Sequence, residues 1–183
     1  MRHVFIAAAL CLPVLAVAPS GAAVQEAPSM ADRLANDPRV TAHRPYGLPI
    51  APTPRSDKGV QFGKFLRFPL QGHADFGRIG VVTPTLKSVR KGDRIVIAFW
   101  ARATGTKDGT PGRIGRVQLE ATPVIRTIFE KSFDIAPEWK MYQLVGNADR
   151  DYAPAALNAA FHMDAARQVL DLGPVFILNY GQS

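Results

Sequence analysis

The feature that most limits how this chain can fold is an alternation of apolar and polar residues between residues 59 and 180. Turn-forming residues interrupt it roughly every 8 to 15 positions, and no window has the spacing of an amphipathic helix. Alternation of this kind is typical of strands that bury one face. The sequence therefore predicts an all-β fold, a two-sheet antiparallel sandwich around one core.

Eight stretches carry this alternation, and turn residues such as Lys91-Gly92-Asp93 separate them. They cover residues 63–70, 77–89, 94–104, 113–122, 125–135, 139–145, 156–163 and 169–180, with the second broken at Pro84. A domain of this size buries roughly two thirds of the surface of its unfolded chain. One domain over residues 59–183 is therefore enough to form a core.

The first 58 residues have a different composition. Residues 1–23 have a basic start, an apolar run and small residues at the end, which predicts a secretory signal peptide. The run is shorter than the roughly 18 to 20 residues that span a bilayer, so we expect a secreted or periplasmic protein with no transmembrane segment in the mature chain. An uncleaved membrane anchor is the alternative. Residues 24–58 are rich in proline and are predicted as an extended arm or linker, with one helical turn capped by Ser29.

Charge and cysteine content narrow the classes of function. The net charge is +7, and the basic residues are scattered singly, which favours an acidic partner but not nucleic acid. A basic surface that only keeps the protein in solution is the alternative. The single cysteine, Cys11, lies within the apolar run. We therefore expect no disulfide and no thiolate metal site in the mature chain.

The predicted strand at residues 94–104 is apolar on both faces. Opposite its core-facing set, Val96, Ala98 and Trp100 stand between Arg94 and Arg102. An apolar patch with a polar rim on the outside of a sheet is typical of a docking surface. The alternative is that the N-terminal arm or a loop covers Trp100.

Six segments between residues 63 and 179 form a recognisable series. They are GKFLRFPL, KGDRIVIAFWARA, IGRVQLEA, KSFDIAPEWKMYQL, LNAAFHM and QVLDLGPVFILNY. In order and spacing they resemble the jelly-roll carbohydrate-binding modules of families 4, 9 and 22. The resemblance implies a galactose-binding-like jelly roll that holds a polysaccharide or oligosaccharide on a concave sheet, without catalysis. The proline-rich arm replaces the Asn-Gly-Phe-Glu run that usually opens the family.

A sugar ring offers C–H groups that pack on aromatic rings and hydroxyls that bond polar side chains. We therefore predict a binding face of aromatic and polar residues, on the condition that their strands share the concave sheet. The predicted members are Trp100, Arg102, Arg116, Gln118, Tyr142, Asn158 and His162. Tyr142 fits a core position equally well, and Trp139 is predicted to close the core beneath a turn.

The same resemblance implies a structural calcium ion at the edge of the sandwich. Such an ion is held by backbone carbonyls and carboxylates, and the aspartate of the last strand matches Asp171. The glutamate that usually contributes from the opening run is missing in this chain. No two histidines have the spacing of a metal site.

Two other classes of function stay open. A glycosidase needs two carboxylates about 5 to 9 Å apart. Glu120 and Glu130 flank a predicted turn and could approach each other, but Arg126 and Lys131 nearby make ion pairing the simpler interpretation. The second class is an envelope protein that uses the sandwich to bind another protein or as a structural element.

Overall fold

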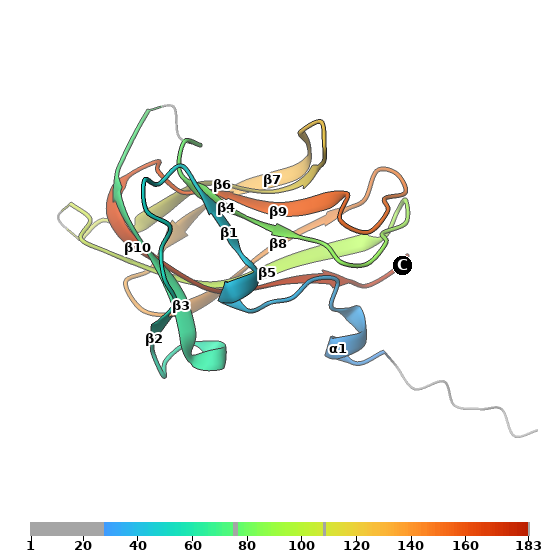
Figure 1. The fold of residues 1–183 in the computed structure, drawn as a ribbon, viewed down its shortest axis with the longest axis horizontal. Coiled ribbons are helices and arrows are strands. Elements are labelled where there is room, and N and C mark those ends of the chain that lie inside the picture. The colour runs from blue at the N-terminus through green and yellow to red at the C-terminus, as the bar shows by residue number, and fades with distance from the viewer. Residues whose placement is uncertain (1–27, 75–76, 108, 183) are drawn as a thin grey trace, which may run out of the picture.

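The computed structural model describes residues 28–74, 77–107 and 109–182 of the chain. These residues form two five-stranded antiparallel sheets packed face to face as a sandwich (Figure 1). One sheet has the strand order β1-β4-β9-β6-β7 and is called the β9 sheet; the other has the order β2-β3-β10-β5-β8 and is called the β10 sheet. The predicted signal peptide, residues 1–23, and the first residues of the predicted arm lie outside the described part.

Short helical turns accompany the two sheets. The β9 sheet consists of β1 (Arg44–Tyr46), β4 (Gly80–Pro84), β9 (Leu157–His162), β6 (Gly112–Ala121) and β7 (Arg126–Ile135). The β10 sheet consists of β2 (Arg55–Ser56), β3 (Lys64–Gln71), β10 (Arg167–Asn179), β5 (Arg94–Thr104) and β8 (Lys140–Asn147). The helical turns are α1 (Met30–Arg33), η1 (Val40–Ala42) and η2 (Gln61–Gly63). Within the described residues, no helix is long and apolar enough to cross a membrane.

Each of the eight predicted strands corresponds to a strand of the structure, and the all-β sandwich is confirmed. The bounds of β5, residues 94–104, agree with the prediction. The stretch predicted over residues 77–89 contains only β4, which ends at Pro84. Proline has no N–H group to donate to a sheet, so the predicted break lies where the strand ends.

The core forms where the inner faces of the two sheets meet. Phe99 from β5 and Phe161 from β9 are fully buried, and their ring centroids are 5.0 Å apart in an edge-to-face arrangement. Phe133 from β7 packs edge to face on Phe99 at 5.2 Å. Burying a phenylalanine side chain stabilises the fold by about 1.5 to 3 kcal/mol. These contacts join strands of different sheets and hold the layers together.

Two parts of the segment predicted as an arm or linker belong to the sandwich, while residues 47–54 between them form neither helix nor strand. Ser29 caps α1 as predicted, because its hydroxyl accepts a bond of 3.3 Å from the N–H of Asp32. Beyond it, β1 pairs with β4 and β2 pairs with β3. The prediction of irregular structure is therefore wrong at both short strands. Pro45 is tolerated because β1 lies at the edge of its sheet, where not every N–H group is needed.

His43 connects this segment to both sheets. Its side chain is buried; Nδ1 lies 3.1 Å from the hydroxyl of Thr83 on β4, and Nε2 lies 3.2 Å from the carbonyl oxygen of Gly173 on β10. A neutral ring fits both contacts, with Nε2–H donating to the carbonyl and Nδ1 accepting from the hydroxyl. Burial lowers the pKa of His43 to about 4, well below its usual 6.5.

The depressed pKa of His43 predicts a loss of stability in mild acid. Between about pH 6.5 and pH 4, His43 is protonated in the unfolded chain but stays neutral in the folded chain. The stability that is present above pH 6.5 is therefore lost as the pH falls. Between pH 7 and pH 5 the free energy of unfolding should fall by about 2 kcal/mol from this group. Urea denaturation at both pH values, on the wild type and on His43→Gln, measures it. An equal loss in both proteins would contradict the assignment.

Candidate functional site

The structure divides the predicted binding residues between the two sheets. Four of them lie on the outer face of the β9 sheet: Arg116, Gln118, Asn158 and His162. Trp100 and Arg102 lie on the outer face of the β10 sheet, away from these four. Tyr142 lies on the inner face, where its ring stacks on Phe99 at 5.5 Å and its hydroxyl accepts a bond of 2.8 Å from the N–H of Ala136. The two alternatives for Tyr142 are thereby resolved in favour of the core.

Strand register brings the four residues of the β9 sheet together. Arg116 on β6 lies directly opposite His162 on β9, and Glu120 lies directly opposite Asn158. Gln118 stands between the two pairs on the same face of β6, but it is only 2% exposed, which does not favour its predicted contact with sugar. Residues directly opposite one another on adjacent strands have their Cβ atoms about 4.5 to 5.5 Å apart. The outer face therefore carries two neighbouring rows of polar side chains, which we call the polar face.

Hydrogen bonds connect the side chains of the polar face and add residues that were not predicted as part of a binding face. The hydroxyl of Tyr46, on β1, lies 2.9 Å from Nδ1 of His162. Thr127, on β7, donates its hydroxyl to Oε1 of Gln118 over 3.0 Å, and Nε2 of Gln118 donates to Glu120. Glu120 could have been found, because it follows Gln118 by two positions on one strand. Tyr46 could not, since it lies in the segment predicted as an arm.

The electrostatics of the polar face keep its central groups neutral near pH 7. Burial, followed by the charges of Glu120 and Asp164, raises the pKa of Tyr46 to about 12. Burial, followed by the charge of Arg116, lowers the pKa of His162 from its usual 6.5. A neutral imidazole and a neutral phenol each offer one donor and an acceptor. The phenol of Tyr46 and Nδ1 of His162 bond each other, and Nε2 of His162 is buried without a partner among the described residues.

The two carboxylates considered for glycoside hydrolysis have other partners. Glu130 forms an ion pair of 3.1 Å with Arg116, rather than with Arg126 or Lys131 as the sequence suggested. Glu120 is only 4% exposed and accepts a hydrogen bond from the side-chain amide beside it. Both carboxylates therefore hold neighbouring side chains of the polar face in place, Glu130 through Arg116 and Glu120 through Gln118.

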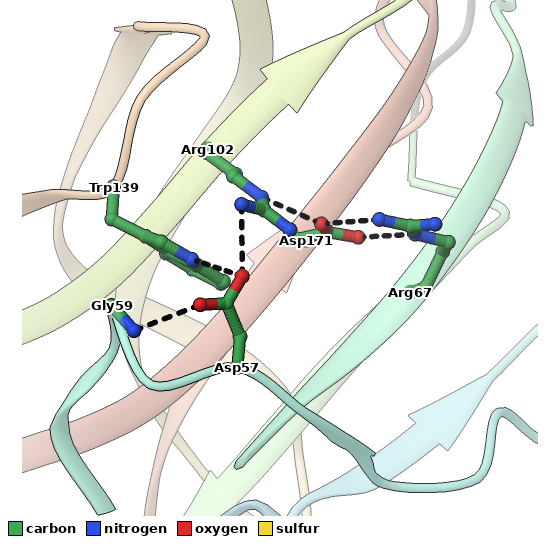
Figure 2. A network of polar contacts seen from close by, with 6 residues as sticks. All are labelled: Asp57, Gly59, Arg67, Arg102, Trp139 and Asp171. Carbon is green, nitrogen blue, oxygen red and sulfur yellow. Dashed lines mark hydrogen bonds and ion pairs between the residues drawn. The ribbon is translucent and has the colours of Figure 1, made fainter. Parts of the chain in front are cut away.

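The outer face of the β10 sheet carries a network of charged side chains (Figure 2). Asp171 on β10 accepts two bonds from Arg67 on β3, of 2.7 and 2.8 Å, and a third of 2.8 Å from Arg102 on β5. Arg102 also forms an ion pair of 3.0 Å with Asp57, and its guanidinium carbon lies 4.7 Å from the centre of the Trp139 ring. The guanidinium of Arg102 thus contacts Asp171, Asp57 and Trp139 within the protein. These contacts do not favour its predicted role as a ligand for sugar.

Asp57 fixes the start of a loop over this face, residues 57–63, which we call the strap. Its carboxylate accepts a bond of 2.8 Å from the N–H of Gly59, and this bond is the main reason why the pKa of Asp57 lies below its usual value. Further along the strap, Gln61 accepts a bond of 3.2 Å from Nε1 of Trp100. Trp100 is therefore bonded to the strap while its side chain stays partly exposed.

Trp139 is structural, as predicted, but it packs on the outer face of the β10 sheet with Arg102 and does not close the core. Its indole packs edge to face on Phe65 with the ring centroids 5.5 Å apart, and its Nε1 donates to Asp57 over 3.1 Å. The ring thereby joins the start of β8, the strap and β3.

The contacts of Asp171 do not fit a calcium ion. Calcium takes about 6 to 8 oxygen ligands, and both oxygens of this buried carboxylate are occupied by Arg67 and Arg102. Two guanidinium groups would also repel a divalent cation. In the part of the chain that is described, no three His, Cys, Asp or Glu side chains cluster in a way that could hold a metal.

Removing divalent ions should leave the melting temperature unchanged. A tightly bound ion stabilises only the folded state, so its removal would lower the melting temperature. The measurement compares thermal melts before and after dialysis against a chelator, followed by addition of calcium chloride. A fall of several degrees in the melting temperature that calcium reverses would show a structural calcium site and contradict this prediction.

Comparison with known proteins gives a match in fold alone. Neither a protein-family model nor a curated protein sequence matches the chain. A solved family 4 carbohydrate-binding module is similar over 76% of this chain and 95% of its own, with a TM-score of 0.56 and 15% identity. The second N-terminal cellulose-binding domain of Cellulomonas fimi β-1,4-glucanase C matches 82% of this chain and 96% of its own, with a TM-score of 0.53 and 19% identity.

A third structure is similar over a comparable length. The family 22 xylan-binding domain of a Paenibacillus barcinonensis xylanase matches 82% of this chain and 94% of its own, with a TM-score of 0.52 and 10% identity. The three matches take in 76 to 82% of this chain. The chain therefore has the jelly-roll fold of these carbohydrate-binding modules, as its sequence motifs predicted.

Proposed function

We propose that this chain is a non-catalytic carbohydrate-binding module that holds a polysaccharide or oligosaccharide on the polar face of the β9 sheet. The observation that carries the proposal is the register between β6 and β9, which sets Arg116, Gln118, Asn158 and His162 side by side. The similarity of the whole sandwich to solved cellulose-binding and xylan-binding domains supports the same function.

The polar face has the chemistry that a sugar chain requires. Arg116 and Asn158 present partly exposed polar groups, and Tyr46 with His162 adds two partly exposed rings in edge-to-face contact, 6.4 Å between centroids. Neighbouring strands lie about 4.7 to 4.9 Å apart, so the two rows can contact a strip of hydroxyls at once. The positive net charge favours an acidic polysaccharide among the candidates.

Catalysis has less support than binding. A glycosidase needs one carboxyl group as an acid and the other as a base or nucleophile, both facing the scissile bond. Glu130 is engaged by Arg116, and Glu120 is buried and hydrogen-bonded. The secreted or periplasmic location stays part of the proposal, because it rests on the predicted signal peptide of residues 1–23.

Affinity electrophoresis of the purified protein tests this function. Native gels containing xylan, hydroxyethyl cellulose or polygalacturonate cover neutral and acidic polysaccharides. We expect one of these polymers to retard the protein, and an Asn158→Ala variant to be retarded less. Equal mobility in all gels and in the polymer-free gel would count against the proposal. Release of reducing sugar from the retarding polymer would instead show an enzyme.

A further inference from the structure

The outer face of β5 forms the floor of an apolar groove in the β10 sheet, separate from the polar face. Val96 and Ala98 on β5 and Leu178 on β10 pack together there, and each is at most 5% exposed. Phe176 on β10 extends this floor. The groove has a volume of about 220 Å³. Its walls are formed by Met30, Gln61, Arg94, Met141, Gln143 and Tyr180. This groove is why β5 is apolar on both faces.

Exposed apolar side chains gather around the groove. Met30 at 63% exposed and Met141 at 38% belong to its walls, and Val145 lies opposite Val96 on β8. Phe62, on the strap, is 55% exposed and packs on Phe176 with the ring centroids 5.9 Å apart. Large exposed apolar patches of this kind mark interaction sites on soluble proteins.

The backbone of Phe62 supports an interaction at this place. Its φ of 61° and ψ of 5° lie in the left-handed region, which is unfavourable for a residue with a large side chain. The strap holds this conformation through Asp57, whose backbone N–H donates to the carbonyl oxygen of Gly63 over 3.1 Å. Backbone conformations of this kind cluster at binding sites. The conformation keeps an aromatic ring exposed beside the groove.

One end of the groove is positively charged. The described residues that line it include no carboxylate, and Arg94 is their only charged member. Tyr180 also lines an adjacent hollow that contains Arg33 and Lys87, and the guanidinium of Arg33 lies 4.4 Å above its ring. Asp32, also in the hollow, is kept ionised by its hydrogen bonds from Ser29, which lower its pKa, and it offsets only one of the positive charges of Arg33 and Lys87. This end of the groove therefore suits a negative group.

We propose that the groove docks an extended segment of a partner protein that carries an apolar side chain and, next to it, a carboxylate. The apolar side chain lies on the floor formed by Val96, Ala98 and Leu178, and the carboxylate lies beside Arg94. A sugar fits this surface less well, because the floor has no side-chain donor or acceptor for its hydroxyls. The edge strand β8 borders the groove, and an extended peptide can bind along the open edge of a sheet.

Selection from a library of random twelve-residue peptides displayed on phage tests this inference. The purified wild-type protein serves as bait. The library is first passed over the immobilised Met141→Asp variant, which depletes peptides that bind outside the groove. We expect selected peptides to combine a large apolar residue with Asp or Glu. In fluorescence polarisation, their dissociation constants should rise at least tenfold for Met141→Asp and for Arg94→Glu. Replacing the acidic residue of the peptide by its amide should abolish most of the effect of Arg94→Glu.

Ile125→Asp is the matched control, because Ile125 is an exposed apolar residue in the turn between β6 and β7. It should leave peptide binding unchanged, and thermal melts of all variants should agree with the wild type. Three results would overturn the proposal: no enrichment on the wild type over Met141→Asp, peptides without an acidic residue, or a concentration-dependent dimer that Met141→Asp abolishes. Loss of polysaccharide retardation in Met141→Asp would instead assign the groove to sugar.

Discussion

Replacing Asp171 by alanine should lower the free energy of unfolding by about 3 kcal/mol, at the low end of the range for breaking a buried ion pair. Asp171 is 2% exposed and joins Arg67 of β3 to Arg102 of β5 across β10. Its loss leaves two partly buried guanidinium groups without their shared partner. The remaining contact between Arg102 and Asp57, and the partial exposure of both arginines, keep the loss from being larger.

Urea denaturation at pH 7 measures this loss, and Asp134→Ala is the matched control. The carboxylate of Asp134 lies 3.4 Å from Arg113, but both side chains are more than half exposed. Exposed ion pairs contribute about 0 to 1 kcal/mol. A similar, small loss in both variants would show that the network in Figure 2 does not stabilise the sandwich.

The double variant Asn158→Ala with His162→Ala should weaken polysaccharide binding by about 100-fold. Asn158→Ala removes hydrogen bonds to sugar hydroxyls, and His162→Ala removes a partly exposed ring that also bonds the hydroxyl of Tyr46. A loss of about 1.4 kcal/mol at each site corresponds to tenfold in affinity. Isothermal titration calorimetry with the polymer that retards the protein measures the effect. Both side chains lie on the outer face and are partly exposed, so the variant should stay folded.

Trp100→Ala is the control for this titration, because it should change stability without changing the affinity for the polysaccharide. Trp100 lies on the other sheet and is bonded to the strap through Gln61. We expect the variant to lose stability because the strap loses a contact, and to keep its affinity for the polysaccharide. Abolished binding in a Trp100→Ala protein that melts like the wild type would move the sugar site to the β10 sheet.

The long strands of the sandwich could be predicted from the sequence, but its short edge strands β1 and β2 could not. The long strands show two-residue alternation because one face of each is buried in the core, and this can be recognised in residues such as Ile95, Ile97 and Phe99. The edge strands β1 and β2 are three and two residues long, and β1 contains a proline. Pairing with β4 and β3 stabilises them, and a contact between distant segments leaves no local pattern.

Only part of the candidate site could be predicted, for a related reason. Alternation shows which residues share a face of one strand, so Arg116 and Gln118 were correctly placed together. It does not show which sheet a strand joins, and β5 pairs with β8 and β10 rather than with β6 or β9. Trp100 and Arg102 were therefore grouped with residues of the other sheet.

The most direct test of the proposed binding face is a titration of the ¹⁵N-labelled protein with an oligosaccharide of the binding polymer, followed by amide chemical shifts. The account predicts shift changes concentrated on the polar face, at Tyr46 on β1, residues 116–120 on β6 and residues 158–162 on β9. The amides of Val96 and Ala98 on β5 should stay unchanged. Shift changes confined to the outer face of the β10 sheet, or none at saturating oligosaccharide, would contradict the assignment of sugar binding to the β9 sheet.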